Sequence, residues 1–101
     1  MTPEGKIKRR VSQFLKTKLN DQLWYDMPVP GGFGGSSLDY LGCYYGMFFS
    51  IETKAPGNKL TPRQEVTKAS MERAGGKVFV IDSDDISELE KWFKWRKIAL
   101  S

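Results

Sequence analysis

Residues 39–54 read DYLGCYYGMFFSIETK, and this stretch decides the fold that we expect. Aromatic and β-branched residues favour strands, and they occur on both sides of Tyr45-Gly46, where glycine favours a tight turn. The second run, Met47–Thr53, has apolar residues at positions 47–49 and 51, so both of its faces carry them, as in a strand that is covered on both faces. The stretch therefore predicts an antiparallel β-hairpin.

The open end of this hairpin carries two carboxylates, Asp39 and Glu52, which antiparallel pairing brings close together. Side chains alternate between the two faces of a strand, so Glu52 and Lys54 project to one side and Thr53 to the other. Paired carboxylates are the oxygen ligands that Mg²⁺ prefers in proteins. The pattern predicts a divalent-metal site with an ammonium group beside it.

The composition is that of a single domain spanning residues 1–101, with 40% hydrophobic and 28% charged residues. Sixteen Lys and Arg against twelve Asp and Glu give a net charge of +4, which suits a polyanionic partner. Cys43 is the only cysteine and histidine is absent, which argues against zinc ligation, a disulfide framework and Ser/His or Cys/His nucleophile systems. Neither a signal peptide nor a membrane span is expected, because no apolar run follows the basic N-terminus.

The N-terminal segment predicts a helix that begins with Thr2 as N-cap and Pro3 in the first turn and ends at Asn20-Asp21. Its apolar stripe consists of Ile7, Val11, Phe14, Leu15 and Leu19, with Lys6, Lys8, Arg9, Arg10 and Lys16 largely outside it. Glu4 falls on the inward face of this helix. It is either a first-turn acid favoured by the helix dipole or an acid that faces the active site.

The remaining segments predict further strands and helices. Residues 23–29 predict a strand, Thr61 and Gln64 form a capping box before a helix over 62–74, and Gly75-Gly76 ends that helix. Lys77–Ile81 predicts a buried strand, and Ser83 caps a last helix. The order is helix, three-stranded meander, helix, parallel strand and helix, so we expect an α/β fold with a mixed sheet flanked by helices.

The glycine-rich stretch PGGFGGSS, residues 30–37, is too rich in glycine for a regular element. It lacks the Gly-Lys-Ser/Thr ending of a P-loop, so we expect no nucleotide cofactor. A flap over bound substrate and a simple connector are both compatible with this composition.

The chain resembles the VRR-NUC family of the PD-(D/E)xK nuclease superfamily, in particular its small stand-alone phage and bacterial members. The matching features are Glu4, Gly-Ser-Ser-Leu-Asp39, Ile51-Glu52-Thr53-Lys54, Leu60-Thr61-x-x-Gln64 and Gly75-Gly76-x-Val78-x-Val80. Leu38 stands where the family has proline. Proline presets the backbone before the aspartate, so we expect a local change of geometry with the ligand retained.

The resemblance implies the αβββαβ restriction-endonuclease-like core, here with a C-terminal helix, and hydrolysis of DNA phosphodiesters with Mg²⁺ or Mn²⁺. Asp39 and Glu52 would bind the metal together with the Thr53 carbonyl, and Glu4 would reach it through a water. Lys54 would orient the attacking water and neutralise charge on the phosphate. Gln64 would orient that water or Lys54, although its place in the capping box explains it equally well. A bacterial cytoplasm, or an infected host cell for a phage protein, is the expected location.

The basic residues around the expected site are candidates for contacts with the DNA backbone. They are Lys6, Arg9, Arg10, Lys59, Arg63 and Lys68. The family's association with branched DNA implies selectivity for structures such as four-way (Holliday) junctions. A homodimer would place two sites on opposed strands. Trp95 in the last helix and Tyr44 and Tyr45 at the hairpin tip are the aromatic residues that suggest such an interface. Trp92 and Phe93 suit the interface and core packing equally well.

Three other functions compete with this one. A general nuclease would nick DNA without structural preference, and a nucleic-acid-binding module of the same fold would bind without cutting. A small interaction protein would carry the same acids as surface charges. The presence of Asp39, Glu52 and Lys54 together favours the nuclease, because a protein that only binds DNA has no physical need for acids facing phosphate.

Overall fold

The computed structural model describes residues 1–29 and 38–100, so the stretch 30–37 with its two interpretations lies outside the described residues. The elements in chain order are α1 (Pro3–Lys16), β1 (Leu23–Asp26), β2 (Tyr40–Tyr44), β3 (Met47–Thr53), α2 (Pro62–Arg73), β4 (Lys77–Ile81) and α3 (Ser87–Leu100). The fold is α/β, and the predicted order of elements is confirmed. No helix among these residues is long and apolar enough to cross a membrane.

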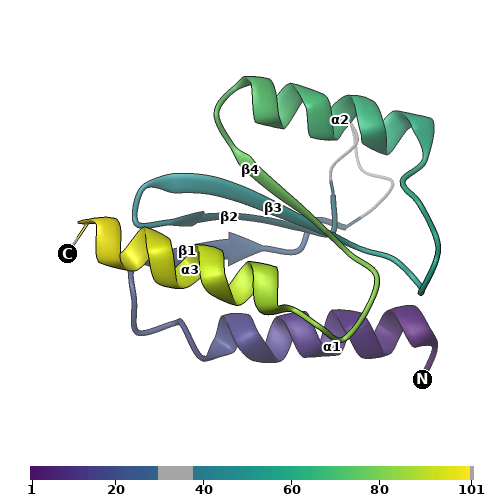
Figure 1. Ribbon diagram of the computed structural model, residues 1–101, viewed down its shortest axis with the longest axis horizontal. Coiled ribbons are helices and arrows are strands. Elements are labelled where there is room, and N and C mark those ends of the chain that lie inside the picture. Colours follow the sequence, from purple (N-terminus) through teal and green to yellow (C-terminus); the bar gives the residue numbers. More distant parts are fainter. Residues whose placement is uncertain (30–37, 101) are drawn as a thin grey trace.

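The four strands form one mixed sheet in the order β1-β2-β3-β4 (Figure 1). β1, β2 and β3 pair antiparallel as a meander. β4 pairs parallel with β3, which requires α2 to cross over one face of the sheet. The predicted hairpin is confirmed, with Tyr40 opposite Ile51 and Tyr44 opposite Met47.

The hairpin turn fixes this register. Tyr45 has φ 47° and Gly46 has φ 80°, so both central residues are left-handed, as a type I′ turn requires. Glycine adopts this conformation without strain, whereas Tyr45 adopts it at a cost. The Arg96 guanidinium donates a 2.8 Å hydrogen bond to the Tyr45 carbonyl and ties the turn to α3.

Helix α1 starts as predicted, because the Thr2 hydroxyl accepts a 3.0 Å hydrogen bond from the Gly5 amide. The helix ends at Lys16, however, and not at Asn20-Asp21. The Thr17 hydroxyl donates a 2.6 Å hydrogen bond to the Phe14 carbonyl, and turns follow the helix. The prediction that Leu19 continues the apolar stripe was therefore wrong, and this side chain is exposed.

Two further boundaries differ from the predictions. β1 ends at Asp26, whose partner in β2 is Leu41, so the strand does not reach residue 29. α3 begins at Ser87 and not directly after Ser83, because short turns come first: the Ser83 hydroxyl accepts from the Asp85 amide, and the Asp85 carboxylate accepts from the Ser87 amide.

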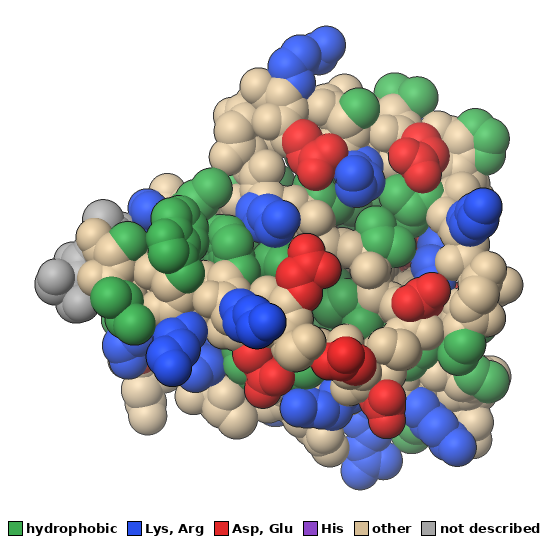
Figure 2. Space-filling model, viewed as in Figure 1, with side chains coloured by type: hydrophobic (Ala, Val, Ile, Leu, Met, Phe, Trp, Pro, Cys, Tyr) green, Lys and Arg blue, Asp and Glu red, His purple; other side chains and the backbone are tan. Residues whose placement is uncertain are grey.

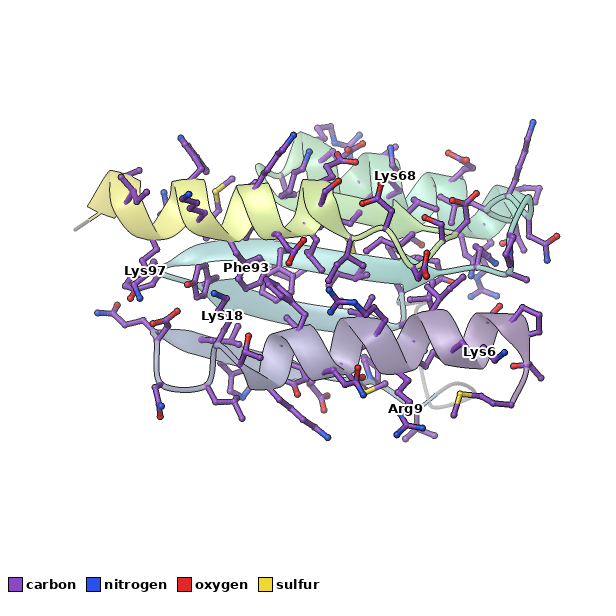
Figure 3. The ribbon with its side chains drawn as sticks, turned by 60° about the horizontal axis from the view of Figure 1, so that its bottom comes forward. Lys6, Arg9, Lys18, Lys68, Phe93 and Lys97 are labelled. Atoms are coloured by element: carbon purple, nitrogen blue, oxygen red, sulfur yellow. The ribbon has the colours of Figure 1, made fainter. Side chains whose placement is uncertain are left out.

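The hydrophobic core lies between the sheet and the pair of helices α1 and α3 (Figure 1). Its members are Ile7, Val11, Phe14 and Leu15 of α1, Tyr40, Tyr44, Phe49, Ile51, Phe79 and Ile81 of the strands, and Ile86, Leu89 and Phe93 at and in α3. Figure 3 shows Phe93 pointing from α3 toward the strands. Its ring packs edge-on against Phe14, at 5.2 Å between centroids.

The aromatic residues divide between core and surface. Tyr44 is 1% exposed and packs against Phe93, with 4.3 Å between ring centroids, so its proposed availability for a dimer interface was wrong. Alternation along β2 places Tyr44 on the same face as the buried Tyr40, and this pattern could have indicated its burial. Tyr45 is half-buried, whereas Trp95 is exposed on α3.

Helix α2 covers the opposite face of the sheet only in part. None of its residues is fully buried, and Phe48 and Val80 beneath this side remain 39% exposed. Figure 2 shows hydrophobic side chains at the surface over the region between α2 and α3, among Lys, Arg, Asp and Glu side chains. The expectation that β3 is covered on both faces therefore holds for Phe49–Thr53 and not for Phe48.

Candidate active site at the carboxyl end of β3

The predicted acidic pair lies where the central strands β2 and β3 meet at one end of the sheet. Asp39 directly precedes β2, and Glu52 and Thr53 are the last residues of β3. Because Tyr40 is opposite Ile51, the register places Asp39 beside Glu52. The N-terminal ends of α1 and α2 lie on this same side of the molecule (Figure 1), so the positive ends of both helix dipoles are near the pair.

The Glu52 carboxylate is held from three directions. Its Oε1 accepts a 3.1 Å hydrogen bond from the Asp39 backbone amide, and its Oε2 accepts a 3.0 Å hydrogen bond from Gln64 Nε2. Lys54 Nζ lies 3.6 Å from the same Oε2. Glu52 is 5% exposed, so its orientation is fixed by these contacts rather than by solvent.

The Asp39 carboxylate is held by Thr53, the last residue of β3. Its Oδ2 accepts hydrogen bonds from the Thr53 amide at 2.9 Å and from the Thr53 hydroxyl at 2.7 Å. The other oxygen, Oδ1, lies 3.6 Å from Lys8 Nζ on α1. Asp39 and Glu52 therefore bind each other's strands reciprocally, which confirms the proximity that the hairpin predicted.

The electrostatics of the pair favour a bound cation. Burial raises the pKa of Glu52 above its usual value, and the negative charge of Asp39 raises it further. The Asp39 amide and the Lys54 ammonium lower this pKa and offset part of the effect. A divalent cation between the carboxylates would remove the repulsion that remains, since it favours the ionised form of both.

Gln64 performs two tasks with one amide group. Its Oε1 accepts a 3.0 Å hydrogen bond from the Thr61 amide, and its backbone amide donates to the Thr61 hydroxyl at 3.2 Å, which completes the predicted capping box. Its Nε2 donates to Glu52. The capping box is therefore confirmed, and the start of α2 is tied directly to the acidic pair. The role of Gln64 in orienting the attacking water or Lys54 stays a prediction.

The residues present fit a magnesium-like ion. Carboxylate oxygens are hard ligands, and Mg²⁺ keeps several waters, so two protein carboxylates are a sufficient share. Asp39 Oδ2 already accepts two hydrogen bonds from Thr53, so Oδ1 is the Asp39 oxygen left for an ion. Glu52 Oε1 accepts one hydrogen bond and keeps a lone pair, because a carboxylate offers about four acceptor positions. No cluster of three or more acidic, Cys or His residues suited to a metal occurs among residues 1–29 and 38–100.

The two other predicted ligands are not tested by these contacts. Glu4 lies in the first turn of α1 and is half-buried, one helical turn before Lys8 and on the same face. It belongs to no metal-suited cluster in the described part of the chain. Its water-mediated contact and the Thr53 carbonyl ligand both stay predictions.

Lys8 is a charged group at the site that sequence reasoning missed. The expectation placed it outside the apolar stripe, yet its ammonium reaches Asp39, and its carbonyl accepts a 2.9 Å hydrogen bond from the Tyr40 hydroxyl. The Ser12 hydroxyl binds the same Tyr40 oxygen at 2.7 Å, which fixes this part of α1 on the sheet. The sequence held no direct signal for this contact, because spacing along α1 identifies neighbours on the same helix and not a partner on another element.

The six predicted DNA-contacting cations lie on different sides of the sheet. Lys6 and Arg9 are on α1 and Lys68 is on α2, as Figure 3 shows. Lys59 and Arg63 are exposed close to the start of α2. Arg10 lies 3.9 Å from Glu90, and Lys68 lies 3.1 Å from Glu72. The structure therefore brings only part of this set, the residues near the helix starts, toward the acidic pair.

Comparison of the chain with protein-family models, with curated proteins and with solved structures finds no match in any of the three.

Proposed function

We propose that the chain is a Mg²⁺- or Mn²⁺-dependent DNA endonuclease of the PD-(D/E)xK type and resembles the VRR-NUC family. The observation that carries the proposal is the reciprocal contact of Asp39 with Thr53 and of Glu52 with the Asp39 amide, with Lys54 beside Glu52. The arrangement of the elements as αβββαβ with a C-terminal helix supports it.

Each residue of the site has a distinct role in this proposal. Asp39 and Glu52 hold the metal, with the Thr53 carbonyl and a water on Glu4 as further contacts. When bound, the metal polarises the scissile phosphate and lowers the pKa of a water. Lys54 orients that water and neutralises the charge that develops on the phosphate. Gln64 keeps Glu52 and the start of α2 in position.

Lys54 is well placed for this task. Its side chain is 14% exposed, so the ammonium lies in a sheltered position beside Glu52. Partial burial strengthens its interaction with an anionic phosphate, because less water screens the charge. The Lys54 ammonium also offsets the repulsion between the carboxylates of Asp39 and Glu52.

The substrate in this proposal is branched DNA, such as a four-way junction, bound through its backbone by a homodimer. Lys6 and Arg63 lie in the first turns of α1 and α2, and Lys59 lies just before α2. Both helices start on the side of the molecule where β3 ends (Figure 1). Phosphate contacts from such cations are salt-sensitive and carry little base specificity. Among the aromatic residues that the sequence suggested for a subunit interface, Trp95 on α3 is the exposed one, at 53%.

The test is cleavage of end-labelled four-way junction, flap and linear duplex DNA with Mg²⁺ or Mn²⁺. We expect paired nicks on the junction and at least a hundredfold loss of rate for Glu52→Gln and for Lys54→Met, since each removes charge stabilisation of the reaction. Arg73→Met, an exposed charge at the end of α2, is the matched control and keeps the parent rate. Metal-independent cleavage, or full activity of either site variant, would refute the assignment.

A further inference from the structure

The face of the sheet that α2 covers in part carries a row of side chains in direct register. Trp24 of β1 is opposite Cys43 of β2, and Cys43 is opposite Phe48 of β3. Neighbouring strands are about 4.8 Å apart, so the two aromatic rings begin about 10 Å apart across the sheet. Trp24 is 64% exposed and Phe48 is 39% exposed. The row therefore presents two aromatic surfaces to solvent.

This row shares its face with the proposed active site. Side chains alternate along β3, so Phe48 and Glu52, four residues apart, project to the same side. At a rise of about 3.3 Å per residue, about 13 Å separates their backbone positions. A single strand with its phosphate at Glu52 would reach the row within about five nucleotides, at roughly 3.4 Å per stacked nucleotide.

A cation, Lys68, lies between the proposed active site and the aromatic row. Gln64, Lys68 and Met71 follow one another on a single face of α2. Gln64 contacts Glu52, whereas Met71 and Phe48 line a groove of about 520 Å³ at the other end. Lys68 is therefore between them. Its ion pair with Glu72 joins partly exposed groups on one helix and is worth little, so a phosphate can replace it.

The chemistry of this surface selects one kind of ligand. Flat apolar rings accept nucleobase faces, and the ammonium between the rings and the acidic pair accepts a phosphate. Asp26, on the same face of β1 as Trp24, repels phosphate and directs a strand across β2 and β3 rather than along the β1 edge. A paired duplex keeps its bases stacked inside, so only unpaired nucleotides can use the rings.

We infer that Trp24 and Phe48 form a stacking surface for unpaired nucleotides next to the scissile phosphate, so that the substrate carries a single-stranded arm or an opened junction branch. The inference rests on the proposed nuclease function and gives it a substrate class. It assigns Trp24 to binding and not to the chemical step.

The test measures binding of a forked duplex with unpaired thymidine arms and of the fully paired duplex, in the Glu52→Gln background so that neither is cut. We expect Trp24→Ala to weaken fork binding about tenfold and to leave duplex binding unchanged, since stacking on one ring accounts for that range. Trp24→Phe keeps a ring and restores most of the affinity. Leu19→Ala, which truncates an apolar side chain that is 56% exposed beyond the end of α1, is the matched control and alters neither.

Equal losses on fork and duplex, the same loss with Leu19→Ala, or no loss with Trp24→Ala would overturn the inference. Conversion of a dimer to a monomer by Trp24→Ala, measured by sedimentation, would overturn it too, because a second copy would then cover the row. If the parent cuts junctions while Trp24→Ala binds forks normally, only this inference fails. If the parent neither binds nor cuts DNA, the nuclease proposal fails.

Discussion

Replacing Gln64 by Glu is the sharpest test of the contact between α2 and the acidic pair. Glutamate keeps the side-chain acceptor that the Thr61 amide requires, so the capping box survives. The Nε2 donor, however, is replaced by a carboxylate oxygen about 3.0 Å from Glu52 Oε2. The change therefore isolates the hydrogen bond to Glu52 from the helix cap.

The expected cost follows from two terms. A hydrogen bond to a charged group contributes about 1.5–3 kcal/mol, and that contribution is lost. Two carboxylates in contact cannot both ionise, so one must stay protonated or both must move apart. Together these give a loss of about 3 kcal/mol in the free energy of unfolding near pH 8, or roughly 10–20 °C in Tm for a domain of this size.

The pH dependence has a definite sign. Burial and the charge of Asp39 already raise the pKa of Glu52, and a second carboxylate beside it would raise the pKa of the more basic group of the pair further, so the folded variant binds a proton more tightly than the unfolded chain. Its stability relative to the parent is highest at low pH and falls as pH rises through those raised values. Near pH 4.5 one protonated group donates to the other, and most of the loss disappears.

Urea unfolding of the parent and of Gln64→Glu between pH 4.5 and pH 8 measures both quantities. Gln13→Glu, which adds the same charge on the exposed side of α1, is the matched control and costs less than about 0.5 kcal/mol. The reasoning is refuted if Gln64→Glu costs no more than this control at pH 8. A loss that does not change with pH would also contradict it.

Two further changes test other contacts. Lys8→Met removes the ammonium that competes for Asp39, so Mn²⁺ should bind roughly two- to fivefold tighter, as expected for a partly exposed ion pair. Lys6→Met is the control and should have little effect. Weaker Mn²⁺ binding by Lys8→Met in a calorimetric titration would contradict the role of this contact. Gly42→Ala places a Cβ 2.4 Å from the buried ring of Phe49, so the free energy of unfolding should fall by at least about 1–3 kcal/mol, and unchanged stability in urea would show that the strand has shifted.

The acidic pair was predictable from sequence because a hairpin converts spacing into proximity. The turn at Tyr45-Gly46 and the apolar run after it fix the register, and the register brings Asp39 to Glu52. The capping box likewise predicted where α2 begins. The hydrogen bond from Gln64 to Glu52 could not be predicted from the capping box, because it depends on how α2 approaches β3.

The remaining parts of the site depend on packing between distant segments. Lys8 lies near Asp39 only because α1 is fixed against β2 through Tyr40 and Ser12. Periodicity marks such a lysine as outside the apolar stripe and says nothing about a partner on another element. The early end of α1 has a local origin instead, since the hydroxyl of Thr17 donates to the Phe14 carbonyl three residues back, which a longer helix would have used.

The most direct measurement of the central claim is calorimetric titration of Mn²⁺ into the parent, Asp39→Asn and Glu52→Gln at the same pH and salt. The account predicts saturable binding by the parent and at least a tenfold weaker affinity for each variant, because each removes one charged oxygen ligand from a two-carboxylate site. Mn²⁺ binding that is equal in all three proteins, or undetectable in the parent, would contradict the claim that Asp39 and Glu52 form a divalent-metal site.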